Sequence, residues 1–183
     1  RLSRTVVIKK VEVEGVDFYY EVDRKGQTNL DGLRYVQSES KAVTFDTTRL
    51  FATLAKSSIH VKDLSRGIEA DIQDAQAQLQ AQNPNNVSLR FNSAGGSANY
   101  KGHENRLGKF DLSARVSEDR VEVDSLSLES KVAHVKAKGR FEDWTRRRYN
   151  FDFDTRVNLD EASRLIESNT IVSGQAAING RIE

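Results

Sequence analysis

The chain has 183 residues, the length of one ordinary domain or of one segment in a longer repetitive protein. Its 28 basic and 27 acidic residues leave a net charge of +1, which gives no electrostatic argument for nucleic acid as a partner. The absence of cysteine excludes disulfides, thiolate metal sites and a thiol nucleophile.

Short segments of alternating apolar and polar residues run through most of the chain. Such alternation places successive side chains on opposite faces of a β-sheet. A change of frame near Asp124 and Ser125 predicts a β-bulge. The spacing of the segments predicts an all-β protein built of antiparallel strands. The segments cover residues 16–22, 43–45, 59–61, 87–91, 110–116, 121–128, 135–141, 149–157 and 172–182.

Two segments interrupt the alternation. Residues 161–167 have apolar side chains at helical spacing, and Asp160 is the predicted N-cap of this short helix. Residues 67–82 fit both a helix and a strand, because apolar residues recur every three to four positions but also alternate at the start of the segment. We favour a strand there. The glycine-rich residues 93–97 are predicted to be a flexible connection.

The polar positions of three consecutive strands carry charges of alternating sign. Cross-strand ion pairs between such neighbours contribute about 0.2–1 kcal/mol each and help to set the register. A solvated outer face is the simplest interpretation of these residues. The acidic, basic and acidic sets are Glu122 and Asp124, then Lys136, Lys138 and Arg140, then Asp152 and Asp154.

The apolar positions require a cover, because a sheet with one apolar face is not stable alone in water. A sandwich, a closed barrel or a curled sheet would each provide it. Alanine, glycine, serine and threonine interrupt these positions, and one short helix is too small to cover the sheet. We therefore expect a curled, open, U-shaped (taco-like) sheet whose apolar interior has room for a hydrocarbon guest.

The segment Asp23–Leu33 follows an amphipathic strand and contains the sequence Gly26-Gln27-Thr28-Asn29-Leu30. It resembles an element of the AsmA-like (TamB) family, in which a strand ends in an Asp-x-x-Gly turn followed by Asn-Leu. Shorter and less specific patterns of the same family are similar to residues 112–141, 157–166 and 173–182. Together these similarities span nearly the whole chain.

This resemblance implies a periplasmic location and a role in phospholipid movement or in the assembly of outer-membrane proteins. AsmA-like proteins are anchored in the inner membrane of diderm bacteria, cross the periplasm as a long apolar β-groove, and are linked to phospholipid movement and to the assembly of outer-membrane proteins. The resemblance therefore implies that residues 1–183 form one β-groove segment of a longer protein, with its membrane anchor elsewhere. It also implies phospholipid acyl chains and outer-membrane β-barrel proteins as partners, without a cofactor.

The residues expected to line the groove are large apolar side chains at the inward positions of the alternating segments. Movement of a lipid along a groove needs many similar shallow contacts rather than one deep site, and this lining would provide them. The predicted lining residues are Phe18, Tyr20, Leu89, Phe91, Phe110, Leu112, Val123, Val135, Phe141, Phe151 and Phe153.

No pattern in the sequence indicates catalysis. His60, His103 and His134 are far apart and have no carboxylate at a metal-ligand spacing, so neither a metal site nor an enzyme is expected. Residues 144–148 combine a tryptophan with three arginines, which we interpret as a solvated turn rather than a lipid head-group contact. Two alternatives to lipid transport stay open: an assembly factor that adds a partner's strand at its sheet edges, and a purely structural β-repeat.

Overall fold

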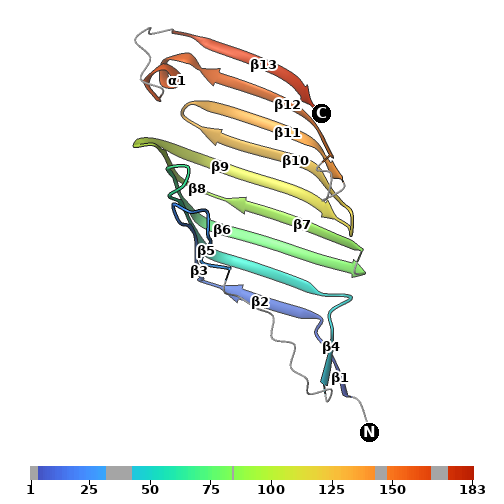
Figure 1. The fold of residues 1–183 in the computed structure, drawn as a ribbon. Coiled ribbons are helices and arrows are strands. Elements are labelled where there is room, and N and C mark those ends of the chain that lie inside the picture. Colours follow the sequence, from blue (N-terminus) through green and yellow to red (C-terminus); the bar gives the residue numbers. More distant parts are fainter. Residues whose placement is uncertain (1–3, 32–42, 84, 143–147, 166–172) are drawn as a thin grey trace.

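The computed structural model describes residues 4–31, 43–83, 85–142, 148–165 and 173–183 of the chain (Figure 1). Within these residues the fold is almost entirely β-strand, with one short helix, α1 (Leu159–Leu165), so the predicted all-β class is confirmed. The strands are β1 (Arg4–Val7), β2 (Lys10–Glu14), β3 (Asp17–Val22), β4 (Val43–Asp46), β5 (Phe51–Asp63), β6 (Ile68–Asn83), β7 (Asn86–Ser93), β8 (Gly95–Tyr100), β9 (His103–Val116), β10 (Arg120–Ser130), β11 (Ala133–Glu142), β12 (Arg148–Asn158) and β13 (Gln175–Ile182).

Eleven strands form one sheet. Its main order is β13-β12-β11-β10-β9-β7-β6-β5-β2, with β3 paired to β5 and β8 inserted between β6 and β9. The first and last strands of this order do not pair with each other, so the sheet is open (Figure 1). Strands β1 and β4 form a separate pair.

The N-terminal strands correct the expectation of an entirely antiparallel sheet. Strands β2 and β3 run parallel to β5, and β1 runs parallel to β4. Alternating apolar residues reveal which side chains share a face, but they carry no information on strand direction. A parallel pair needs a long connection, and the residues between Val22 and Val43 are numerous enough to return the chain.

Pairing resolves the segment that fitted both a helix and a strand. Residues Ile68–Asn83 form β6, which pairs with β5 along one side and with β7 and β8 along the other. Long-range ladders on both sides therefore override the helical spacing of the apolar residues. The predicted bulge is also confirmed, because the register of β10 against β11 shifts between Val123 and Leu126.

The N-cap of α1 differs from the prediction. The Asn158 side-chain oxygen accepts hydrogen bonds from the backbone N–H groups of Asp160 and Glu161, at 3.1 and 3.3 Å. Asn158 is thus the cap, since a capping side chain lies before the first helical turn. The Asp160 carboxylate instead accepts a hydrogen bond from the Gly174 backbone N–H at 3.2 Å. The predicted helix end at residue 167 lies outside the described residues.

A line of strand irregularities, here called the crease, crosses the sheet from β2 to β10. At four of its positions the backbone has a positive φ, with values of 69°, 48°, 49° and 146°. Extra residues of this kind bend a strand and increase its twist. In Figure 1 the halves of β5 and β6 beyond the crease, together with β3 and β8, turn away from the rest of the sheet. The four positions are Gly15, Lys56, Asp74 and Gly95, and the line continues through Gly108 and Glu129.

Close approach of neighbouring strands fixes the crease from β8 to β10. A Cβ atom at Gly95 would lie 2.7 Å from the Leu107 carbonyl oxygen, and one at Gly108 would lie 3.1 Å from the Glu129 Cβ. Only glycine fits at position 95, because a Cβ atom would be too close to the Leu107 carbonyl oxygen and because a φ of 146° is unfavourable for other residues. Residues 93–97, predicted to be a flexible connection, instead carry this bend and the start of β8.

Burial shows which side of the crease is the inner one. Ser57, Ala75 and Ser93 are at most 3% exposed, and the register places all three on the apolar face. On the other face Lys56 is exposed and binds Glu14 through a 2.6 Å ion pair. Since the inside of a bend is the crowded side, the apolar face is concave along the crease.

Candidate functional site

The strand register places all eleven predicted lining residues on one face of the sheet. Directly paired residues share a face, and along a strand every second residue returns to it. The structure shows that these residues share one face. That lipid binds to this face stays a prediction. The face carries Phe18 and Tyr20 on β3, Leu89 and Phe91 on β7, Phe110 and Leu112 on β9, Val123 on β10, Val135 and Phe141 on β11, and Phe151 and Phe153 on β12.

The apolar face is poorly covered by the protein itself. Among the described residues only Val22, Ala75 and Ala114 are buried apolar side chains, and no large side chain is fully buried. Phe18 is 45% exposed, and Ile178 on β13 is 50% exposed. A sandwich or filled barrel of this size would bury its large apolar residues at high packing density. This face therefore presents a wide apolar surface to solvent.

A hollow of about 640 Å³ lies over strands β10 to β13. Its lining residues group around one row of paired positions on the apolar face: Leu126, Ala137, Phe153 and Gly180. The small residue Ala137 leaves space between the larger side chains of Leu126 and Phe153. The row crosses the strands, so the hollow is elongated perpendicular to them. At roughly 4.8 Å per strand, four strands give it a length of about 14 Å.

Two phenylalanine rings lie against glycines of neighbouring strands, one in the lining of this hollow and one beside it. A Cβ atom at Gly180 would lie 2.6 Å from Phe153 Cζ, and one at Gly139 would lie 2.8 Å from Phe151 Cδ1. Each ring thus covers the neighbouring backbone and lies low on the face. The resulting wall is apolar and shallow, without a fixed polar anchor on the row itself.

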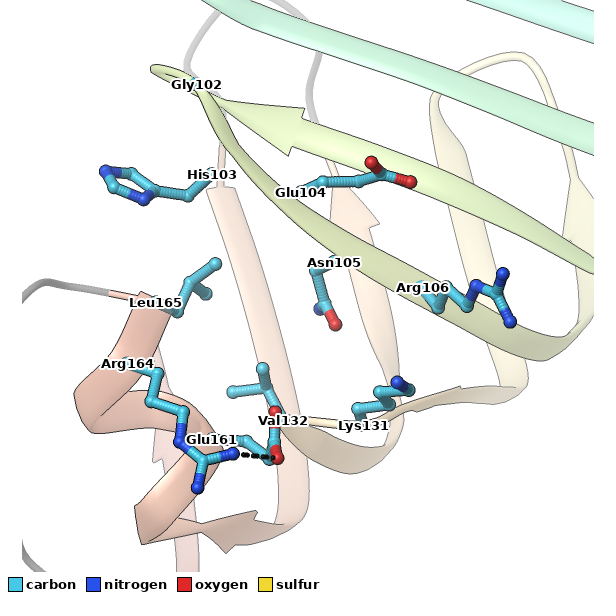
Figure 2. Close-up of a pocket in the computed structure, with 10 residues that line it drawn as sticks. All are labelled: Gly102, His103, Glu104, Asn105, Arg106, Lys131, Val132, Glu161, Arg164 and Leu165. Atoms are coloured by element: carbon cyan, nitrogen blue, oxygen red, sulfur yellow. Dashed lines mark hydrogen bonds and ion pairs between the residues drawn. The ribbon is translucent and has the colours of Figure 1, made fainter.

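A second hollow of about 670 Å³, shown in Figure 2, lies between α1, the start of β9 and the β10–β11 turn. Its lining is mostly polar: His103, Glu104, Asn105 and Arg106 come from β9, and Lys131 comes from the turn. From α1, the Arg164 Nη1 atom donates to the Glu161 Oε1 atom at 3.0 Å. Cations and carboxylates occur together around this hollow, so its charge selects no particular ligand.

The opposite face carries ion pairs that hold neighbouring strands in register. The Arg115 guanidinium on β9 binds Asp124 and Glu122 on β10, at 2.6 and 3.2 Å. The Arg181 guanidinium on β13 binds Asp152 on β12 at 2.8 Å, and this hydrogen bond lowers the pKa of the Asp152 carboxyl. The sequence correctly placed Asp124 and Asp152 among cross-strand pairs, but both use an arginine from a strand outside the predicted set.

An aromatic and ionic cluster spans β3, β5 and β6 on this same polar face. The Tyr19 and His60 rings are stacked with centroids 4.5 Å apart, and His60 Nδ1 lies 2.5 Å from Asp71 Oδ1. The histidine thus has a carboxylate partner that sequence spacing did not reveal, because Asp71 reaches it across a hairpin. In the described residues no group of three or more His, Asp or Glu side chains could hold a metal ion.

The most specific part of the family resemblance has a structural role at the edge of the sheet. The Asn29 Oδ1 atom accepts a hydrogen bond from the Glu21 backbone N–H at 3.0 Å, and Asn29 Nδ2 donates to the Tyr19 carbonyl at 2.9 Å. The Asp23 carboxylate accepts from the backbone N–H groups of Lys25 and Gln27, which closes the preceding turn. These contacts satisfy backbone groups of β3 that would otherwise face solvent.

Comparison of the chain with protein-family models, curated proteins and solved structures finds no match. None of the described helices is long and apolar enough to cross a membrane. Sequence reasoning identified the shared apolar face but missed the crease, although Gly95 and Gly96 marked one point of it. The non-glycine bulges at Lys56 and Asp74 have no signal in a single sequence.

Proposed function

We propose that this chain is a periplasmic segment of an AsmA-like protein and that its apolar face carries phospholipid acyl chains between the inner and outer membranes. The observation that supports this most is the concave apolar face, which is continuous over eleven strands and is not filled by the chain's own side chains. Each methylene group buried there contributes about 0.8 kcal/mol. The head group would stay in water at the open side.

The shape of the apolar face suits a ligand that must move. The hollow over β10–β13 is shallow, and its central row of Leu126, Ala137, Phe153 and Gly180 offers no hydrogen-bonding side chain. Similar apolar rows continue on the neighbouring strands. A chain held only by apolar contact can shift from one row to the next without breaking a specific bond. The role is passive and requires no catalytic group.

The membrane context of the proposal comes from the resemblance around Asp23–Leu33. Its turn and its asparagine both make ordered contacts, so the motif is part of the folded edge of the sheet. The periplasm, the inner-membrane anchor and the direction of transport follow from that resemblance alone.

The proposal is tested by extracting the purified chain and analysing the extract by mass spectrometry. We expect phospholipid to co-purify with the chain. Ala137→Asp, which places a charge on the floor of the hollow, should reduce the recovered lipid at least several-fold. The matched control is Ala177→Asp, the same change on the polar face, where the new carboxylate lies opposite Arg156. Absence of lipid from the unmodified chain, or equal loss in both variants, would contradict the proposal.

A sheet edge among the described residues favours a second candidate function, assembly of outer-membrane β-barrel proteins by strand addition. Strand β13 pairs with β12 on one side, and no described strand lies on its other side. Lysine or proline substitutions at Gln175 and Ala177, polar-face positions of β13 that do not line the hollow, should then abolish capture of an unfolded outer-membrane protein in a pull-down and leave lipid recovery unchanged. Loss of lipid without loss of capture would instead favour acyl-chain transport.

A further inference from the structure

A third hollow, of about 500 Å³, lies beside the β10–β11 turn, at the end of the sheet that also carries α1 (Figure 1). Its volume is within the range of small-molecule pockets, about 300–1,000 Å³. Its ionisable lining residues are His134, Lys136, Asp154 and Arg156 from β11 and β12, and Lys131 from the turn. The strand register places the first four on the polar face, opposite to the apolar row described above.

Positive charge is in excess around this hollow. Lys131, Lys136 and Arg156 are exposed cations, whereas Asp154 is the one carboxylate among the lining residues. The net charge of the lining is therefore +2 when His134 is neutral. An excess of one sign on a concave surface attracts ligands of the opposite sign.

The neighbouring strands do not compensate these cations. Lys136 lies opposite Ser127 on the β10 side, and Arg156 lies opposite Ala177 on the β13 side. Asp154 lies opposite Lys136 on β12, but within the described part of the chain no ion pair involves Lys136 or Arg156. One carboxylate beside two such cations leaves a positive charge that a ligand can neutralise.

Arginines on other strands of the polar face show the contrast. Arg181 on β13 binds Asp152 at 2.8 Å, and Arg115 on β9 binds Asp124 at 2.6 Å. These two guanidinium groups hold neighbouring strands in register. Arg156 has no such role, so its guanidinium is available to a ligand.

The positions of the two strand cations suit one small anion. Lys136 and Arg156 are diagonal neighbours on β11 and β12, about 7–8 Å apart at the backbone, which is within reach of two long side chains. A guanidinium binds two oxygens of a phosphate at once, and a lysine ammonium adds a point charge. We propose that this hollow binds the phosphate group of a phosphate ester, through Arg156 and Lys136, with Lys131 beside them on the turn.

This site goes beyond the proposed transport function, because its charged side chains lie on the face opposite to the acyl-chain surface. Two sources supply the same phosphate chemistry: a soluble phosphate ester, or the head groups of an anionic bilayer. Either ligand would bind through charge, so its affinity should fall as the salt concentration rises.

Titration with glycerol 3-phosphate at constant ionic strength, followed by amide chemical shifts, tests the site. We expect saturable shifts at Lys136 and Arg156, and none with glycerol. Arg156→Gln should weaken the affinity several-fold. The matched control is Arg90→Gln, which removes an exposed arginine of the same face on β7, outside the hollow, and should leave the affinity unchanged. Asp154→Asn removes the one lining carboxylate and should strengthen the affinity.

The absence of saturable shifts in the unmodified chain would overturn the proposal. Equal weakening by Arg156→Gln and Arg90→Gln, or weaker binding in Asp154→Asn, would overturn it as well. Co-sedimentation with phosphatidylglycerol vesicles, compared with phosphatidylcholine vesicles, distinguishes the two sources. Binding to the anionic vesicles that Arg156→Gln abolishes assigns the site to lipid head groups. No vesicle binding, with the glycerol 3-phosphate affinity retained, assigns it to a soluble phosphate ester.

Discussion

At the scale of single residues, aspartates organise the turns of this protein. The Asp31, Asp46 and Asp63 carboxylates each accept hydrogen bonds from backbone or hydroxyl groups two or three residues away. Hydrogen bonds to the ionised form lower the pKa of a carboxyl group, and the pKa of all three aspartates is lowered. Asp46 and Asp63 are the last residues of β4 and β5, so these two surface charges also mark where a strand ends.

The lowered pKa values of these aspartates predict that the folded chain loses stability in acid. The Asp63 pKa is lowered chiefly by the Ser65 hydroxyl, so between its folded and unfolded pKa values the folded chain binds fewer protons than the unfolded chain. Its contribution is complete above the unfolded pKa, about 3.9, and is lost as the pH falls through the folded value. Denaturant titrations at pH 7, 5 and 3 should show the decrease below pH 4. Asp63→Asn and Ser65→Ala should both make this decrease in stability smaller. An unchanged pH dependence of stability in both variants would refute the role of Asp63.

The hydrogen bonds of Asn29 predict that replacing this residue lowers the free energy of unfolding, by an amount that does not depend on charge. Replacing it by alanine leaves the Glu21 N–H and the Tyr19 carbonyl without the amide partner. We expect the free energy of unfolding to fall by about 1 kcal/mol, and hydrogen exchange at Glu21 to accelerate. Asn85→Ala in the exposed β6–β7 turn is the matched control, because its side chain makes no contact among those described. Equal effects of the two substitutions would remove the special role of Asn29.

At the scale of secondary-structure elements, the crease determines the shape of the sheet. Its irregularities are spread over residues far apart in sequence, but pairing aligns them, as Ser57 against Ala75 and Gly96 against Leu107 illustrate. One bulge bends one strand, whereas an aligned row bends the whole sheet. The small side chains on its inner side allow the bend.

The crease is tested by enlarging its most buried side chain. Ala75 is fully buried on the inner side of the bend, whereas Ala77, two residues along the same face of β6, is partly exposed. We expect Ala75→Leu to destabilise the chain by about 1–3 kcal/mol through overpacking. Ala77→Leu should change the free energy of unfolding by less than about 0.5 kcal/mol. Urea titration measures both, and a tolerated leucine at position 75 would show that the inner side of the crease is not crowded.

The same elements show what a single sequence could and could not predict. Alternation predicted the all-β class, the bulge in β10 and the common face of residues as distant as Phe18 and Phe153, because the two-residue period is local. Strand direction depends on where the chain returns, so the parallel pairs were missed. The cap of α1 was misplaced by two residues, because Asn158 and Asp160 are both good capping residues and only geometry distinguishes them.

At the scale of the whole molecule, the two faces of the sheet have different roles. The polar face is held by cross-strand ion pairs such as Arg115–Asp124, which are exposed and individually weak. The apolar face is continuous but covered only in part, so the chain forgoes much of the free energy that a closed core of the same residues would supply. A ligand on that face would recover part of this free energy.

A direct consequence is that an apolar ligand should stabilise the folded chain. A ligand that binds only the folded state raises the free energy of unfolding by about 2.7 kcal/mol at one hundred times its dissociation constant. Thermal unfolding followed by circular dichroism, with a long-chain lysophospholipid kept below its micelle concentration, should therefore show a rising midpoint. A short-chain analogue with the same head group should have no effect, because it buries too few methylene groups. Ala137→Asp should weaken the stabilisation and Ala177→Asp should preserve it. A shift that depends on the head group but not on chain length would place the ligand away from the apolar face.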